Sequence, residues 1–170
     1  MSLTRTMSLS KAQQITMIQY VSLLGVISIL PLFHQQWLTG PIVNAVLIVA
    51  VSLLGVQNAV LFGLIPSTIA LSVGLLPAPL APMIPFIIIS NAIYVLGFNY
   101  FREKNFFGGI VVGSVLKFVF LWATSFIVVN LIVQAPIAAK VSGVMSWPQL
   151  ATALIGGVIA YGFLKSIKKI

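Results

Sequence analysis

The stretch G-G-I-V-V-G-S-V-L-K-F-V-F-L-W-A-T-S-F-I-V-V-N-L-I-V-Q, residues 108–134, decides the class of fold. As a helix it is long enough to cross a bilayer, because about 30 Å of hydrocarbon needs roughly 20 mostly apolar residues. Lys117 is the single charged residue in it. Apolar runs of similar character continue on its N-terminal and C-terminal sides. The sequence therefore predicts an all-α integral membrane protein.

The composition excludes a water-soluble fold and most enzyme chemistry. Hydrophobic residues make up 60% of the 170 positions and charged residues 6%, whereas soluble domains carry about 25% charged residues. The chain has no Cys, and Glu103 and His34 are its only acid and its only His. Disulfides, paired carboxylates and multidentate metal sites are thus unavailable to this sequence. We expect no catalytic activity, metal or cofactor.

Six apolar runs are separated by Pro, Gly and polar residues, and we predict one membrane domain over residues 1–170 with six transmembrane helices. Pro66 and the proline-rich stretch at residues 74–82 indicate that the second and third runs turn rather than form one long helix. The predicted spans are residues 15–33, 41–57, 59–76, 84–101, 108–134 and 147–164.

The distribution of cations predicts the orientation. An even number of spans places both termini on one side of the membrane, and cytoplasmic loops carry the excess of Lys and Arg. With both termini cytoplasmic, Lys140 alone lies outside. Seven cations then lie inside: Arg5, Lys11, Arg102, Lys104, Lys165, Lys168 and Lys169. Because these cations cluster in the segments outside the spans, they indicate the orientation of the chain in the membrane rather than a nucleic-acid partner.

Small residues recur at four-residue spacing, which allows helix backbones to approach closely in lipid. We expect these rows to serve packing. They are Gly55, Ala59, Gly63 and Ser67; Gly109 and Gly113; Ala153 and Gly157; and Gly156 and Ala160.

Lys117 lies near the middle of its predicted span and shares a helix face with Gly109 and Gly113. Burying its ammonium costs at least about 2.5 kcal/mol unless it is compensated. The spans contain no carboxylate, so compensation must come from backbone carbonyls, amide oxygens, water or an anionic ligand. Two readings stay open. Lys117 either snorkels to the cytoplasmic interface along its stem or faces a ligand.

Other polar and aromatic groups gather near the predicted outer ends of the spans. The connection P-L-F-H-Q-Q-W-L-T-G-P, residues 31–41, is predicted to be irregular and able to fold down as a lid. The alternative roles are membrane-interface belt residues and helix-to-helix hydrogen bonds. The candidate residues of an outward-facing pocket for a small molecule are His34, Gln36, Trp37, Thr39, Asn44, Asn91, Lys117, Trp147 and Gln149.

Three stretches carry a resemblance to a known family. They are T-G-P-I-V-N-A at residues 39–45, G-x-x-x-A-x-x-x-G-L-I-P-S at residues 55–67, and G-L-L-P-A-P-L-A-P-M-I-P-F-I at residues 74–87. Together with six spans in a short chain and a basic tail, they resemble the substrate-binding S components of energy-coupling factor (ECF) transporters. The resemblance covers roughly residues 15–165.

The resemblance implies a subunit of the bacterial or archaeal cytoplasmic membrane that captures a vitamin or similar micronutrient. If Lys117 pairs with the ligand, we expect that ligand to be anionic. The resemblance also implies an S-component-like bundle, lids at residues 34–39 and 76–83, and partner chains consisting of a T component and ATPases. This chain has no phosphate-binding G-x-x-x-x-G-K-[ST] motif of its own. A small channel or facilitator and a non-transporting scaffold subunit remain the competing functions.

Overall fold

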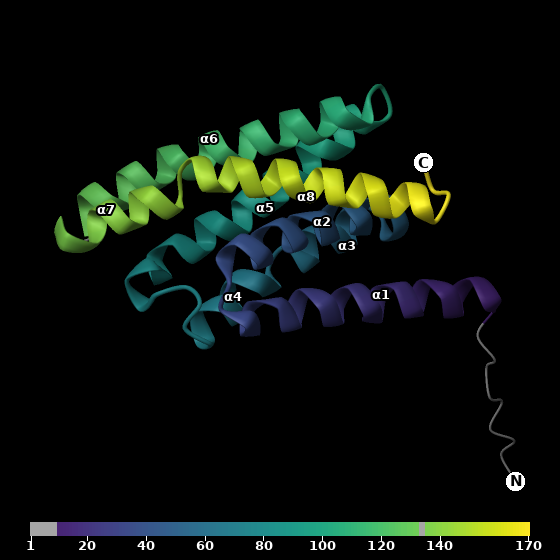
Figure 1. Cartoon of the computed structure of the whole chain (residues 1–170), viewed down its shortest axis with the longest axis horizontal. Helices are drawn as coiled ribbons and strands as arrows, with labels where there is room; N and C mark the ends of the chain where they lie inside the picture. Colours follow the sequence, from purple (N-terminus) through teal and green to yellow (C-terminus); the bar gives the residue numbers. More distant parts are fainter. Residues whose placement is uncertain (1–9, 133–134) are drawn as a thin grey trace, which may run out of the picture.

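A computed structural model describes residues 10–132 and 135–170, and every regular element in those ranges is helical (Figure 1). The long helices run side by side as a bundle. In chain order the elements are α1 (Lys11–Ile29), the 3-10 helix η1 (Leu30–Phe33), α2 (Gln36–Leu54), α3 (Val56–Phe62), α4 (Ile65–Ser72), the 3-10 helix η2 (Ala78–Met83), α5 (Ile84–Arg102), α6 (Phe106–Ile132), α7 (Ala135–Val144) and α8 (Trp147–Ser166).

Five helical segments in the described ranges are long and apolar enough to cross a membrane. They are Lys11–Phe33, Gln36–Leu54, Ala78–Arg102, Phe106–Asn130 and Val141–Ser166. The prediction of a helical protein with several potential membrane spans is therefore confirmed. The third predicted span is not one helix, because residues 59–76 fall on α3, α4 and the segment after them. The short pair α3 and α4 still returns the chain toward the end where α1 finishes (Figure 1).

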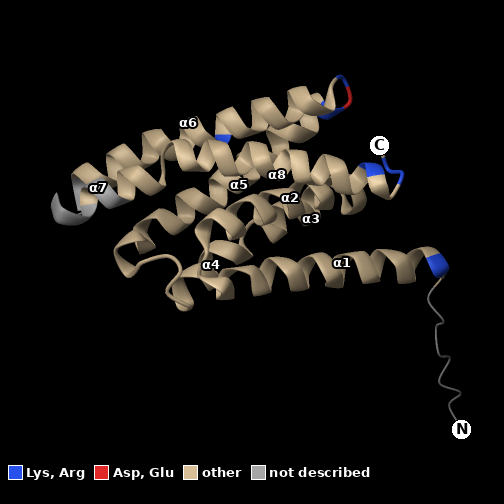
Figure 2. Cartoon of the chain, in the orientation of Figure 1, with Lys and Arg blue, Asp and Glu red and all other residues tan. Residues whose placement is uncertain are grey.

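The charged residues gather at one end of the bundle. The start of α1, the turn between α5 and α6, and the C-terminus lie together there, and almost all the coloured charges of Figure 2 are found on them. The exception within the bundle is a cation on α6. Arg5 and the side chain of Lys140 lie outside the described part of the chain. Among the side chains that the structure describes, the two ends of the bundle therefore differ sharply in charge.

Close backbone contacts hold the central helices together. A Cβ on Gly109 would lie 2.9 Å from the Phe98 carbonyl oxygen, and one on Gly113 would lie 2.8 Å from the Tyr94 carbonyl oxygen. On α8, a Cβ on Gly156 would lie 2.5 Å from the Pro41 carbonyl oxygen. Only glycine fits at these three positions, so the predicted packing role of the small residues in the fifth and sixth spans is confirmed.

The row that starts at Gly55 behaves differently. Gly55 ends α2 with a φ of 86°, a left-handed conformation that glycine adopts without steric cost. Ala59 lies on α3, Gly63 lies in the break before α4, and Ser67 lies on α4. Gly63 packs against Asn91, and Ala59 and Ser67 are buried, so the predicted packing role holds at these three positions. It fails at Gly55, where an added Cβ would meet nothing within 4 Å.

Two predicted loops contain helix. In the segment 31–41, only His34 and Gln35 separate η1 from α2, and Pro41 lies inside α2. Pro41 lies beyond the first turn of α2, so it removes one backbone hydrogen bond from the helix interior. The connection before Trp147 contains α7, whose Val141 packs with Leu121 of α6. Burial of apolar side chains thus extends helix into both connections.

Candidate functional site

Lys117 of α6 points into the bundle and is 3% exposed. Its Nζ donates hydrogen bonds to Oδ1 of Asn44 at 2.6 Å and to Oδ1 of Asn91 at 2.8 Å. These partners come from α2 and α5, so one side chain joins three helices. The snorkelling reading is wrong for this structure, because the amino group is held inside by two amides. The pairing uses amide oxygens, one of the compensating groups open to this sequence.

The backbone fixes the orientation of both amides. Nδ2 of Asn44 donates to the Gly40 carbonyl oxygen at 2.9 Å, within α2. Nδ2 of Asn91 donates to the Gly63 carbonyl oxygen at 2.9 Å, across to the break between α3 and α4. Because each amide nitrogen bonds a carbonyl, each amide oxygen is turned toward Lys117. The two asparagines are therefore acceptors for the lysine rather than adaptable partners.

Tyr94 completes this cluster from α5. Its ring centroid lies 5.5 Å from Nζ of Lys117, within the range of a cation–π interaction. Its hydroxyl donates to the Ala153 carbonyl oxygen of α8 at 2.9 Å. Sequence reasoning did not select Tyr94, although it follows Asn91 by three residues and therefore shares its helix face. That spacing is the signal that could have found it.

A cavity of about 120 Å³ lies against this cluster. Of the nine predicted pocket residues, six line it: Gln36, Thr39, Asn44, Asn91, Lys117 and Gln149. The starts of α2 and α8 contribute to it, which places the cavity in the half of the bundle away from the charged end (Figure 1). The apolar side chains of its lining come from Val43, Ala70, Leu75, Leu76, Ile87 and Met145.

Two of the lining residues also donate side-chain hydrogen bonds to backbone carbonyl oxygens. Oγ1 of Thr39 donates to the Leu30 carbonyl oxygen at 3.1 Å, which joins α2 to η1. Nε2 of Gln149 donates to the Val144 carbonyl oxygen at 3.1 Å, which spans the bend between α7 and α8. These bonds shape the cavity wall near the ends of the helices.

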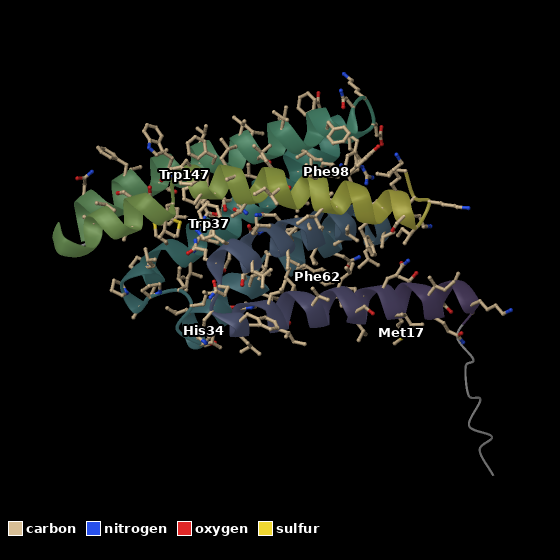
Figure 3. All side chains as sticks on the ribbon, viewed as in Figure 1. Met17, His34, Trp37, Phe62, Phe98 and Trp147 are labelled. Carbon is tan, nitrogen blue, oxygen red and sulfur yellow. The ribbon has the colours of Figure 1, made fainter. Side chains whose placement is uncertain are left out.

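Three predicted pocket residues do not line this cavity: His34, Trp37 and Trp147. His34 is exposed at the turn between η1 and α2. Trp37 and Trp147 are 56% and 62% exposed, and their ring centroids lie 5.5 Å apart (Figure 3). Trp37 instead lines a neighbouring cavity of about 110 Å³, and Gln36 lines both cavities. The predicted lid at residues 34–39 is therefore mostly helix, and two of its residues, Gln36 and Thr39, lie in the cavity wall.

The second predicted lid, residues 76–83, contributes Leu76 to the cavity and then forms η2 from Ala78 to Met83. Leu80 and Met83 are almost fully buried against Leu121 of α6 and its neighbours. This segment is thus packed onto the bundle.

Toward the charged end, apolar packing closes the bundle beyond the cluster. Leu47, Ile48 and Phe98 have no exposed surface and belong to the same buried core as Tyr94. Figure 3 places Phe98 between the labelled tryptophans and the charged end. Apolar side chains therefore fill much of the core on that side of Lys117, together with the buried hydroxyl of Ser114, which lies about one turn of α6 closer to the charged end.

The described residues contain no group of three or more His, Cys, Asp or Glu side chains placed to hold a metal ion. Comparison with known proteins finds no matching family model, no matching curated protein and no matching solved structure.

Proposed function

We propose that this protein is a membrane-embedded solute-capture subunit of an importer, of the ECF S-component type, and that it takes up a vitamin or similar micronutrient. One observation carries the proposal: a lysine, two asparagines and a tyrosine form a buried cluster on the wall of a cavity within the apolar bundle. Ionisable groups at membrane depth are costly and most often serve a ligand or ion.

The charge distribution supports an outward-facing cavity. Loops rich in Lys and Arg stay in the cytoplasm, and the described cations outside the bundle centre gather at one end (Figure 2). The cavity lies in the other half, at the starts of α2 and α8. Both termini would then be cytoplasmic in a bacterial or archaeal membrane, and the cavity would receive solute from outside.

The packing favours capture over free passage. A channel needs polar groups along its whole length, whereas Leu47, Ile48 and Phe98 fill the bundle toward the charged end. Transport through this protein would therefore need a movement driven from elsewhere. The sequence has no nucleotide-binding motif of the P-loop type, so we assign the energy to partner chains, namely a T component and ATPases. A scaffold would leave the Lys117 cluster without a ligand.

Mass spectrometry of small molecules that co-purify in mild detergent tests the proposal. We expect a solute that is retained by the wild-type protein and by Lys165→Met, a charge deletion at the exposed end of α8. The same solute should be lost from Lys117→Met. Helical circular dichroism and a cooperative melting transition would show that all three proteins are folded. Absence of a retained solute from folded wild-type protein would contradict the proposal.

Proteoliposomes distinguish capture from a channel or facilitator. The protein alone should bind the identified solute and leave its downhill flux at the rate of empty liposomes. Solute-specific flux through the isolated protein would favour the channel, and a folded protein without any solute would favour the scaffold.

A further inference from the structure

We infer that the cavity takes a small carboxylate anion with a compact apolar body, and that one carboxylate oxygen accepts a hydrogen bond from Nζ of Lys117. This inference rests on the proposed capture function and names the class of solute. It depends on the charge of the cluster, its count of hydrogen-bond donors and acceptors, and the size and lining of the cavity.

No opposite charge lies beside the amino group of Lys117. Lys117 is 3% exposed, and its partners Asn44, Asn91 and Tyr94 are neutral groups. The only acid of the chain, Glu103, is exposed at the turn between α5 and α6, at the charged end of the bundle. A buried charge is stabilised most effectively by an opposite charge that is also hydrogen-bonded. Within this chain no such charge reaches Lys117, so an anionic ligand is the complementary occupant.

The hydrogen-bond inventory points the same way. An ammonium has three N–H donors and no acceptor, and two of those of Lys117 are used by Asn44 and Asn91. The Tyr94 ring supplies an attractive face without a lone pair. Each asparagine donates one amide N–H to a backbone carbonyl and keeps a second. The described part of the cluster therefore has unused N–H donors, and each asparagine side-chain oxygen already accepts a hydrogen bond from Lys117.

A surplus of donors selects against solutes that are themselves donors. An alkylammonium would meet a like charge at Lys117 and would compete with it for the same two amide oxygens. A neutral carboxamide could accept one hydrogen bond from Lys117 but brings no negative charge, and its N–H groups would depend on the oxygens of Gln36, Thr39 and Gln149 elsewhere in the lining. A carboxylate is acceptor-only when ionised. It therefore matches the cluster in both charge and hydrogen bonding.

The size and apolar lining of the cavity restrict the rest of the ligand. Its volume of about 120 Å³ is below the ~300–1,000 Å³ of pockets for drug-sized ligands. Val43, Leu76, Ile87 and Met145 contribute apolar surface. One cation also favours a monoanion over a phosphate dianion, which recruits several donors or cations. The best fit is a short aliphatic carboxylate.

An isosteric series tests the inference: isobutyrate, isobutyramide and isobutylamine share a branched body and differ in the head group. Binding to the detergent-purified full chain would be measured by isothermal titration calorimetry. We expect isobutyrate to bind at least about tenfold more tightly than isobutyramide, and isobutylamine not to bind. Lys117→Met should remove the preference for the anion, and Lys165→Met should keep it. Lys117→Arg, which retains the charge, guards against a folding defect in the methionine variant.

Three results would overturn the inference. One is equal affinity for isobutyramide and isobutyrate; another is an undiminished anion preference in folded Lys117→Met; the third is no binding by any straight or branched carboxylate of two to six carbons. A neutral or cationic solute that co-purifies with the wild-type protein would also overturn it while leaving the capture function in place. The capture function fails separately, when folded protein retains no solute of any charge.

Discussion

Asn91 of α5 donates from its side-chain amide to the backbone carbonyl of Gly63, at 2.9 Å, across the break between α3 and α4. The same asparagine accepts a hydrogen bond from Lys117. The break within the third predicted span is thereby linked directly to the wall of the cavity. Backbone irregularity inside a membrane is tolerated where the freed polar groups are satisfied by the protein.

Substitution Gly63→Ala tests this link. The new Cβ would lie 3.0 Å from Cβ of Asn91 and 3.1 Å from the Val60 carbonyl oxygen, and neither atom belongs to the flexible end of a side chain. We expect a loss of about 1–3 kcal/mol in stability and weaker solute retention. Gly25→Ala is the control, because its Cβ meets nothing within 4 Å. Equal melting temperatures for the two variants would contradict the prediction.

Gly156→Ala should be more damaging. Its Cβ would lie 2.5 Å from the Pro41 carbonyl oxygen and 2.9 Å from the Ala45 nitrogen, so α2 and α8 would have to separate. We expect destabilisation at or beyond the upper end of about 1–3 kcal/mol, seen as a lower melting temperature in detergent. Gly162→Ala, on the same helix with nothing within 4 Å of the added Cβ, should melt like the wild type.

A double-mutant cycle measures the coupling of Asn44 to Lys117. Asn44→Leu removes one acceptor from a buried amino group, which should cost about 1–3 kcal/mol. Lys117→Met removes the group that needs the acceptor. The double variant should therefore lose about 0.5–3 kcal/mol less than the sum of the two single variants. Chemical or thermal unfolding in one detergent would provide the free energies.

The control cycle combines Lys117→Met with Asn130→Leu. Asn130 is exposed on α6 and bonds the Phe126 carbonyl oxygen of its own helix. Its effect should add to that of Lys117→Met within about 0.3–0.5 kcal/mol. Additivity in both cycles would mean that Asn44 and Lys117 do not stabilise each other.

Orientation is open to direct measurement, because the chain has no native Cys. We expect a membrane-impermeant maleimide to label Ser142→Cys on α7 in intact cells. Lys104→Cys, at the turn between α5 and α6, should be labelled only after the membrane is permeabilised. The reverse pattern would place the charged end outside and would contradict the positive-inside argument.

The sequence was sufficient to predict the helical class and the helix face on which Lys117 lies. In lipid every backbone polar group must be bonded within the segment, so long apolar runs become helices. The spacing of Lys117 from Gly113 and Gly109 then determined which face it shares, and Gly109, Gly113 and Lys117 are all buried. Both predictions depend on local periodicity, which a single sequence contains.

The interrupted third pass could not be predicted with the same certainty, because the run V-L-F-G-L-I-P-S is continuously apolar. Pro66 provided a signal for the start of a helix, since proline is favoured in the first turn, and α4 does begin at Ile65. Where α3 ends depends on the contact of Gly63 with Asn91, which are 28 residues apart. Such a long-range contact has no local pattern.

The predicted pocket mixed residues that belong to different helix faces. On α2, Gln36, Gly40, Val43 and Asn44 follow helical spacing and all line the cavity. Trp37 is one residue beyond Gln36 and therefore points about 100° away. The prediction treated residues 34–39 as a loop, so this difference in direction was invisible.

The contact between Trp37 and Trp147 gives the protein a built-in optical reporter. Their rings lie 5.5 Å apart at an interplanar angle of 42°, next to the starts of the two helices that help to line the cavity. Only one other tryptophan, Trp122, is present, and it is exposed on α6. A solute that moves α2 relative to α8 would change the separation of the two indoles. Near-ultraviolet dichroism and emission of the unlabelled protein would then follow occupancy in real time.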